Sequence, residues 1–184
     1  PKLKALCLLA KQYDIGLTVD AEESERLDIS LDIIEAVFSD PDLGDWEGFG
    51  LAVQAYQKRA IHVIEWLRVL TQTVGRRLMV RLVKGAYWDS EIKHTQQMGL
   101  DEFPVFTRKS STDVSYHACA NKLLDYRDTI FPQFATHNAY TASVIIELAG
   151  GDTIKNGDAG FEFQCLHGMG DSLYDQVVTE VGVQ

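Results

Sequence analysis

The stretch LMVRLVKGAYW, residues 78–88, decides the fold, because it begins as an apolar strand and ends in polar and small residues. Side chains alternate along a strand, so Arg81 and Lys84 lie on opposite faces. An arginine inside such a strand is costly unless it meets an acceptor, such as an acid, a phosphate or a ring nitrogen of a ligand. Gly85 and Ala86 would let the backbone approach a flat ligand closely.

The same change from strand to helix repeats on both sides of this stretch. Strands are expected at 15–23, 49–56, from residue 78, and at 133–138 and 161–169, with an extended piece at 105–109. Helices are expected at 2–11, 26–38, 60–74, 89–98, 113–126, 140–149 and 172–181. Gly75 is well placed to end the helix at 60–74. This alternation predicts an α/β protein with a parallel sheet.

Polar residues at the ends of the strands distinguish between two architectures with parallel sheets. A doubly wound sheet usually has a GxGxxG turn after its first strand, and the sequence contains none. A (βα)8 TIM-like barrel instead places functional residues at the carboxyl ends of several strands. The sequence has that pattern at 20–23, 54–57, 84–87, 136–138 and 164–167. The predicted fold is therefore a (βα)8 TIM-like barrel.

The predicted barrel is incomplete, because the segment holds about five of the eight strands that closure requires. Residues 1–184 are expected to be part of a single barrel domain whose flanking elements are missing. The chain begins at Pro1 without Met and ends in VTEVGVQ, so we expect an internal segment of a longer parent polypeptide.

Composition excludes several classes of protein. The formal net charge is −10, which argues against nucleic-acid binding through this segment, since phosphate contacts need clustered Lys and Arg. Three distant cysteines, Cys7, Cys119 and Cys165, form no metal-ligand spacing and are expected to be buried or half-buried thiols in a reducing compartment. No apolar run approaches the roughly 20 residues of a membrane span.

Several strand-end residues allow more than one interpretation. Asp20 either caps a turn or pairs with a nearby cation, or it orients an amine or another active-site group. Lys84 could form an ordinary salt bridge, contact an anion or cofactor, or form a Schiff base. Thr107 to Lys109 could clamp an anion or form a solvated basic turn. His137 is most simply a hydrogen-bond donor, although a metal site with His167 or Glu162 stays open.

In order along the chain, six segments resemble signature segments of the proline dehydrogenase domain, in the form found in bacterial proline utilization A proteins. They are DAEE (20–23), QAYQKR (54–59), RLVKGAYWDSEIK (81–93), VFTRKSSTDVSYHACA (105–120), FATHNAYT (134–141) and FEFQCLHGMGDSLYDQV (161–177). The resemblance covers about residues 12–178. Each motif alone is moderately specific, and the ordered set is highly specific.

The resemblance implies a barrel that holds FAD without a covalent bond and oxidises L-proline to Δ1-pyrroline-5-carboxylate by hydride transfer to the flavin, the first step of proline catabolism to glutamate. It implies that electrons pass to membrane quinone. It also implies a bifunctional parent whose second, NAD-dependent domain oxidises glutamate semialdehyde and lies outside this segment. The expected location is cytoplasmic, with a peripheral position at the inner membrane face as an open alternative. No metal is implied.

The resemblance also assigns roles to residues. Asp20, Arg81 and Tyr87 would be catalytic, and Asp20, Tyr87 and Leu166 would contact the substrate. Arg81 would lie beside the reactive edge of the flavin. The residues implied to bind the cofactor are Gln54, Arg81, Lys84, Gly85, Ala86, Trp88, Thr107, Lys109, Thr136, His137, Asn138 and Gln164.

The segment departs from the family pattern in four places. An adjacent arginine pair and an early-strand lysine that hold the substrate carboxylate are absent, and Arg76-Arg77 lies at the wrong end of the barrel to replace them. The 150–160 loop is longer than expected, and Tyr140 replaces a histidine. The isolated segment is expected to be inactive. Two rival interpretations are a lyase or hydrolase that uses Lys84 or His137, and a non-catalytic or regulatory relic.

Overall fold

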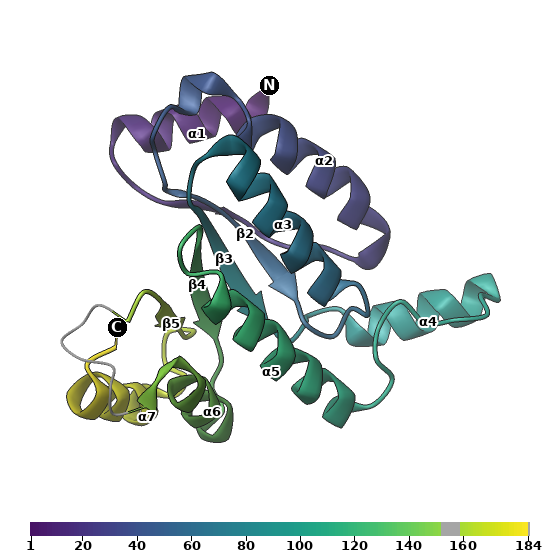
Figure 1. Ribbon diagram of the computed structural model, residues 1–184. Helices are drawn as coiled ribbons and strands as arrows, with labels where there is room; N and C mark the ends of the chain where they lie inside the picture. The colour runs from purple at the N-terminus through teal and green to yellow at the C-terminus, as the bar shows by residue number, and fades with distance from the viewer. Residues whose placement is uncertain (152–158, 184) are drawn as a thin grey trace.

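The computed structural model describes residues 1–151 and 159–183 of the chain (Figure 1). Its strands are β1 (Leu17–Val19), β2 (Phe49–Gln54), β3 (Leu78–Val83), β4 (Ile130–Ala135) and β5 (Glu162–Gln164). Its α-helices are α1 (Lys2–Gln12), α2 (Leu27–Phe38), α3 (Ala60–Val74), α4 (Trp88–Met98), α5 (Lys109–Asp125), α6 (Ala139–Ala149) and α7 (Asp171–Gln176). Short 3-10 turns are η1 (Ser24–Arg26) and η2 (Pro41–Leu43), and a π-helical turn (Val177–Val181) continues α7.

The five strands form one parallel sheet in the order β1-β2-β3-β4-β5. Sequential parallel pairing with helical crossovers is the repeating unit of a TIM-like barrel. Figure 1 shows α3 and α5 lying across one face of the sheet, while α4 extends away from its body. All five carboxyl ends lie at the same edge, and we call this edge the mouth. The predicted α/β class and parallel sheet are confirmed.

The two faces of β3 differ as the alternation predicts. Leu78, Val80 and Leu82 are completely buried on the face that the helices cover. Arg81 lies on the other face, where the register places it beside Ala52 of β2 and Gln133 of β4. This second face corresponds to the interior of a barrel, and we call it the inner face. The parallel register therefore aligns polar side chains from several strands in one layer.

The helix at 60–74 has the predicted bounds, and Gly75 ends it in the left-handed region at φ 72°. Two predicted strands are much longer than the observed ones. Residues 20–23 and 165–169 form loops instead, since both strands are at edges of the sheet and have one partner each. The piece at 105–109 is also different, because Val105 makes only an isolated bridge to Gln57 and α5 already begins at Lys109.

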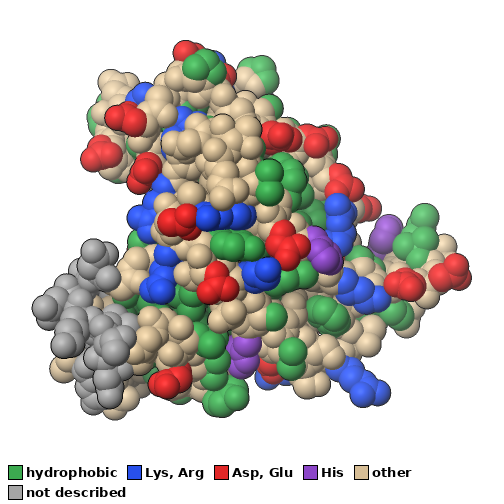
Figure 2. All heavy atoms as spheres, viewed as in Figure 1, with side chains coloured by type: hydrophobic (Ala, Val, Ile, Leu, Met, Phe, Trp, Pro, Cys, Tyr) green, Lys and Arg blue, Asp and Glu red, His purple; other side chains and the backbone are tan. Residues whose placement is uncertain are grey.

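The outer face of the helices carries acidic and basic side chains side by side (Figure 2). Arg59 of α3 pairs with Asp28 of α2, and Lys122 of α5 pairs with Glu65 of α3. Such exposed pairs contribute little stability individually. Within the described part of the chain, no helix is both long and apolar enough to cross a membrane.

The cysteine prediction is only partly right. Cys7 and Cys119 are completely buried, and burial raises the pKa of both thiols. Cys165 is exposed, because it follows the end of β5 in a loop at the mouth. The prediction of a long 150–160 loop falls mostly on residues 152–158, which lie outside the described residues.

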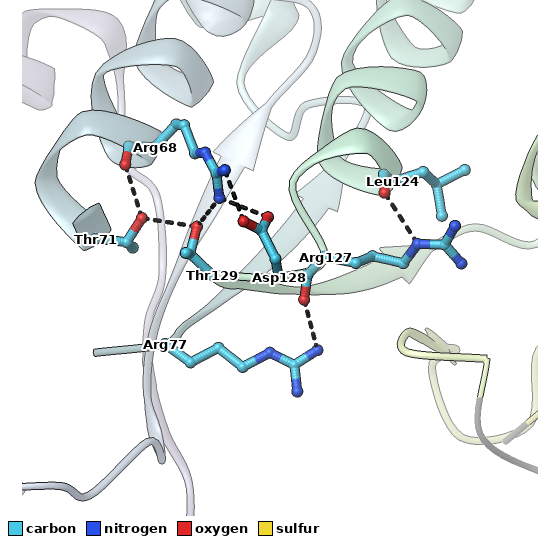
Figure 3. Close-up of polar contacts among 7 residues, drawn as sticks. All are labelled: Arg68, Thr71, Arg77, Leu124, Arg127, Asp128 and Thr129. Carbon is cyan, nitrogen blue, oxygen red and sulfur yellow. Dashed lines mark hydrogen bonds and ion pairs between the residues drawn. The ribbon is translucent and has the colours of Figure 1, made fainter. Parts of the chain in front are cut away.

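The amino ends of β3 and β4 are joined by arginines (Figure 3). Arg77 donates a hydrogen bond to the Arg127 carbonyl oxygen at 3.1 Å. Arg68 of α3 pairs with Asp128 at 2.6 Å and also donates to the Thr129 hydroxyl. Arg76 donates to backbone carbonyls at Phe38 and Gly44. The Arg76-Arg77 pair therefore lies at the end opposite the mouth, as predicted.

Candidate active site

Arg81 is the centre of a polar group on the inner face. Its Nη1 lies 2.7 Å from Asp20 Oδ1, beyond the end of β1, and its Nε donates to Gln164 Oε1 at 2.6 Å. The Arg81 side chain is 28% exposed and that of Asp20 is 78% exposed. The structure thus brings together three predicted site residues, from β3, from β5 and from the loop after β1. The positive charge of Arg81 is accessible from the mouth.

The polar group continues beyond Arg81 along β5 and β4. Gln164 Nε2 donates to Glu162 Oε1 at 2.7 Å, and Gln133 Nε2 donates to the same oxygen at 2.8 Å. Sequence reasoning considered Glu162 only as a weak metal ligand and gave Gln133 no role. The signal that could have indicated Glu162 is its position, because Glu162 and Gln164 are two residues apart on a strand and share a face.

Gln54 joins two loops at the mouth. Its Nε2 donates to the Glu22 carbonyl oxygen at 2.8 Å, and its Oε1 accepts from the Ala86 backbone N–H at 3.0 Å. The side chain is 3% exposed, so it lies beneath these loops. The observed role of Gln54 is to fix the loop after β1 relative to the loop after β3. Direct contact with a flavin ring stays a prediction.

Gly85 is packed against an aromatic ring of the protein itself. Its φ is 142°, and a Cβ at this position would lie 2.4 Å from Tyr56 Cγ. Tyr56 is 2% exposed, and burial, together with the charges of Glu91 and Glu23, raises the pKa of its phenol. The flat group that requires a glycine here is therefore Tyr56. Gly85 itself and Ala86 are exposed at the mouth.

Lys84 lies on the helix side, opposite to Arg81. Its Nζ is 2.5 Å from Asp113 Oδ1 of α5, and this contact holds the pKa of Asp113 below its usual value. Lys84 Nζ also lies 5.9 Å from the centre of the Tyr116 ring. Of the three interpretations of Lys84, this geometry matches the salt bridge. It offers no support for the lyase alternative.

Tyr87 and Trp88 lie where the loop after β3 enters α4. Trp88 is 41% exposed, and its Nε1 donates to the Phe106 carbonyl oxygen at 2.9 Å. One turn later, Glu91 is 4% exposed and accepts from the backbone N–H of Ser24 at 2.6 Å and from its hydroxyl at 2.7 Å. This contact, which sequence reasoning missed, is a second link between the loops after β1 and β3.

The residues after β4 take structural roles. Asn138 Oδ1 accepts from the Thr141 backbone N–H at 3.0 Å and so caps α6. The Thr136 hydroxyl accepts from the Asn138 backbone N–H. His137 Nε2 accepts from the Leu166 backbone N–H at 2.9 Å, which connects the loops after β4 and β5. His137 is therefore a hydrogen-bond acceptor in this contact, where the simplest interpretation had predicted a donor.

The remaining predicted residues are exposed near the mouth. Leu166 is 65% exposed, and Thr107 and Lys109 are exposed at the start of α5. Tyr140 is 71% exposed, and its ring centre lies 5.8 Å from that of His117. Among residues 1–151 and 159–183, His, Cys, Asp and Glu side chains form no group of three or more that could hold a metal ion.

The chain is similar to known proteins over nearly its full length. It matches the family model described as Proline dehydrogenase over residues 2–184. The bifunctional protein PutA of Escherichia coli strain K12 is 58% identical over 182 residues, which are 98% of this chain and 14% of that protein. Proline dehydrogenase 1 of Bacillus subtilis strain 168 is 28% identical over 167 residues, 91% of this chain and 47% of that protein.

Solved structures show the same likeness. A crystal structure of Bradyrhizobium japonicum proline utilization A, mutant D779W, has a TM-score of 0.93 and 55% identity over 99% of this chain and 18% of that one. Proline utilization A from Bdellovibrio bacteriovorus inactivated by N-propargylglycine has a TM-score of 0.89 and 29% identity, over 96% of this chain and 18% of that one. The chain thus spans a small part of these relatives.

Proposed function

Because the chain belongs to the proline dehydrogenase family, we propose that it forms part of an FAD-dependent enzyme that oxidises L-proline to Δ1-pyrroline-5-carboxylate. The family is generally flavin-dependent. The observation that carries the proposal is Arg81, a partly exposed cation on the inner face that Asp20 and Gln164 hold in place. Such an arrangement suits a ligand on which negative charge develops.

The residues at the mouth fit a flavin by their chemistry. Arg81 would lie beside the reactive edge of the ring, and Ala86 and Trp88 would line it from the loop after β3. Thr107 and Lys109, exposed on the rim, offer a hydroxyl and a cation of the kind that hold a pyrophosphate. Gln54, whose oxygen accepts from the Ala86 backbone N–H, and Gln164 would contact the flavin as well, and Thr136, His137 and Asn138 would complete the contacts. Bound FAD would supply the hydride acceptor.

The protein itself would bind and orient the substrate. Asp20, whose carboxylate is 78% exposed, would orient the cationic amine of proline, while Tyr87 and Leu166 would pack against its ring. Arg81 would supply a fixed positive charge beside them. Asp20, Arg81 and Tyr87 are thus the residues to which we assign catalysis.

We further propose that residues 1–184 are one part of a single barrel that the rest of the parent polypeptide closes. The edge strands β1 and β5 each have one partner in the described sheet, and edge strands offer backbone groups for pairing. The likeness to bifunctional PutA proteins supports a parent with a second, NAD-dependent domain. We propose membrane quinone as the electron acceptor and, from the three free thiols, a cytoplasmic location.

Anaerobic addition of L-proline to the parent polypeptide, with the absorbance of the flavin followed over time, tests this function. Bleaching is the expected result. The proposal fails if the parent binds no flavin. It also fails if the flavin ignores proline while a chelator or borohydride abolishes another activity. The segment alone, purified in parallel, is expected to give no bleaching, because the elements that hold the substrate carboxylate in the family lie outside it.

A further inference from the structure

Glu162 lies at one end of a line of hydrogen bonds that reaches Arg81. Gln164 Nε2 donates to Glu162 Oε1 at 2.7 Å, and Gln164 Oε1 accepts from Arg81 Nε at 2.6 Å. On its other side, Glu162 accepts from Gln133 Nε2 at 2.8 Å, and Gln133 is 5% exposed. Two amides, those of Gln133 and Gln164, therefore hold the Glu162 carboxylate in place.

The chemistry of these groups fixes the orientation of the Gln164 amide. An ionised carboxylate can only accept hydrogen bonds, and a guanidinium can only donate them. An amide between the two must turn its NH2 group to Glu162 and its oxygen to Arg81. With the opposite orientation, its NH2 group would face the guanidinium and two donors would meet. Glu162 and Arg81 thus favour the same orientation of the Gln164 amide, with its oxygen toward the guanidinium.

We propose that Glu162 is a positioning residue that fixes Arg81 beside the flavin by orienting the Gln164 amide. This inference rests on the proposed function, in which Arg81 stabilises the reduced flavin. Asp20 holds the guanidinium at Nη1, so the Gln164 oxygen at Nε is its second anchor. Without that anchor, the guanidinium can swing about the Asp20 contact, and its positive charge is no longer held at one point of the mouth.

The proposal predicts an effect opposite in sign to a direct electrostatic one. Removing a negative charge near a flavin favours its reduced, more negative form, so a direct effect of Glu162→Leu would raise the midpoint potential. Loosening the cation Arg81 disfavours the reduced form, so a positioning role lowers the potential. The sign of the change separates the two explanations.

The experiment uses the flavin-loaded parent polypeptide with Glu162→Leu, which removes the oxygen that accepts from Gln164 and Gln133. The midpoint potential of the flavin, measured by chemical titration without proline, is expected to fall. Proline-dependent flavin reduction is expected to slow roughly tenfold, as for the loss of a hydrogen bond to a charged group. Glu35→Leu, the same change at an exposed position on α2, is the matched control and should leave both quantities unchanged.

Two further variants complete the design. In an Arg81→Met background, Glu162→Leu should no longer lower the potential, because the group it acts on is gone. Gln164→Met breaks the same link without changing any charge and should also lower the potential. It decides the matter if Glu162→Leu does not fold.

A potential that rises or stays constant overturns the inference, as does an equal shift in the Arg81→Met background. A parent whose flavin responds to Glu162→Leu but is not reduced by proline would contradict the proposed function alone. A parent that reduces its flavin with proline and ignores Glu162→Leu would contradict the positioning role alone. A parent that binds no flavin would overturn both.

Discussion

The buried side chains of Gln54 and Glu91 join the loops after β1 and β3 to each other, whereas the loops after β4 and β5 are joined by the exposed side chain of His137. Gln54 and Glu91 both connect the segment around Glu22 to the segment around Ala86. In the second region, Asn138 caps its own helix and His137 accepts one backbone N–H. Contacts within this chain therefore organise the first region. Of the two side-chain partners of Arg81, Asp20 and Gln164, only Gln164 belongs to the second region.

This difference suggests that the two regions have different roles. Catalytic groups need supporting contacts that lock their positions, and the first region has them. The second region has fewer such contacts, and two of its predicted ligand contacts, His137 and Leu166, are exposed. We therefore expect substitutions in the first region to have the larger effects.

The largest effect is expected from Arg81→Met, which removes the cation shared by the two regions. Proline-dependent reduction of the flavin in the parent should slow by at least about a hundredfold, the range for loss of one group that stabilises developing charge. Rapid-mixing absorbance measurements would detect it. Arg59→Met, which removes an exposed ion pair with Asp28 on the helix side, is the control and should have little effect. Similar rates in the two variants would contradict the role of Arg81.

Gly85→Ala should give the largest loss of stability. The new Cβ would lie 2.4 Å from Tyr56 Cγ, at a φ of 142°. We expect the free energy of unfolding to fall by about 3 kcal/mol, from overpacking and backbone strain together. Urea denaturation of the parent, followed through the bound flavin, would measure it. Gly99→Ala also has a positive φ but meets no atom within 4 Å, so its cost should be nearer to about 1 kcal/mol.

Glu91→Ala tests the link between the first two loops. Its buried carboxylate accepts two hydrogen bonds from Ser24, and removing it leaves those donors without their partner. The expected loss is about 2 kcal/mol. Glu102→Ala, at an exposed pair with Lys58, should cost less than about 0.5 kcal/mol. Adding Ser24→Ala to Glu91→Ala should cause little further loss, and an additive loss would show that the two residues act separately.

The sequence predicts the helices and strands better than it predicts the side-chain contacts between them. The helix at 60–74 was predicted from its apolar spacing and from Gly75, which are local signals. The edge strands were predicted too long, because the residue types at 20–23 and 165–169 also occur in strands. Their real conformation depends on tertiary contacts such as Gln54 with the Glu22 carbonyl oxygen.

The candidate site shows the same limit. Arg81 inside an apolar strand predicts an acceptor, and the structure supplies Asp20 and Gln164. The contacts of Glu91 with Ser24 and of Tyr56 with Gly85 join residues from different strand–helix units. No periodicity within one segment can indicate such pairs, because they depend on the register between strands and on the paths of the loops.

Asn138→Ala, in the second region, should have the smallest of these effects. The Asn138 side chain accepts from the Thr141 backbone N–H at the start of α6, and loss of such a cap costs about 1 kcal/mol. Asn138→Asp keeps the acceptor oxygen and should retain most of the stability in the same urea experiment. A loss for Asn138→Ala as large as that for Glu91→Ala would mean that this cap supports more than its own helix. The loops after β4 and β5 would then be as tightly organised as those after β1 and β3.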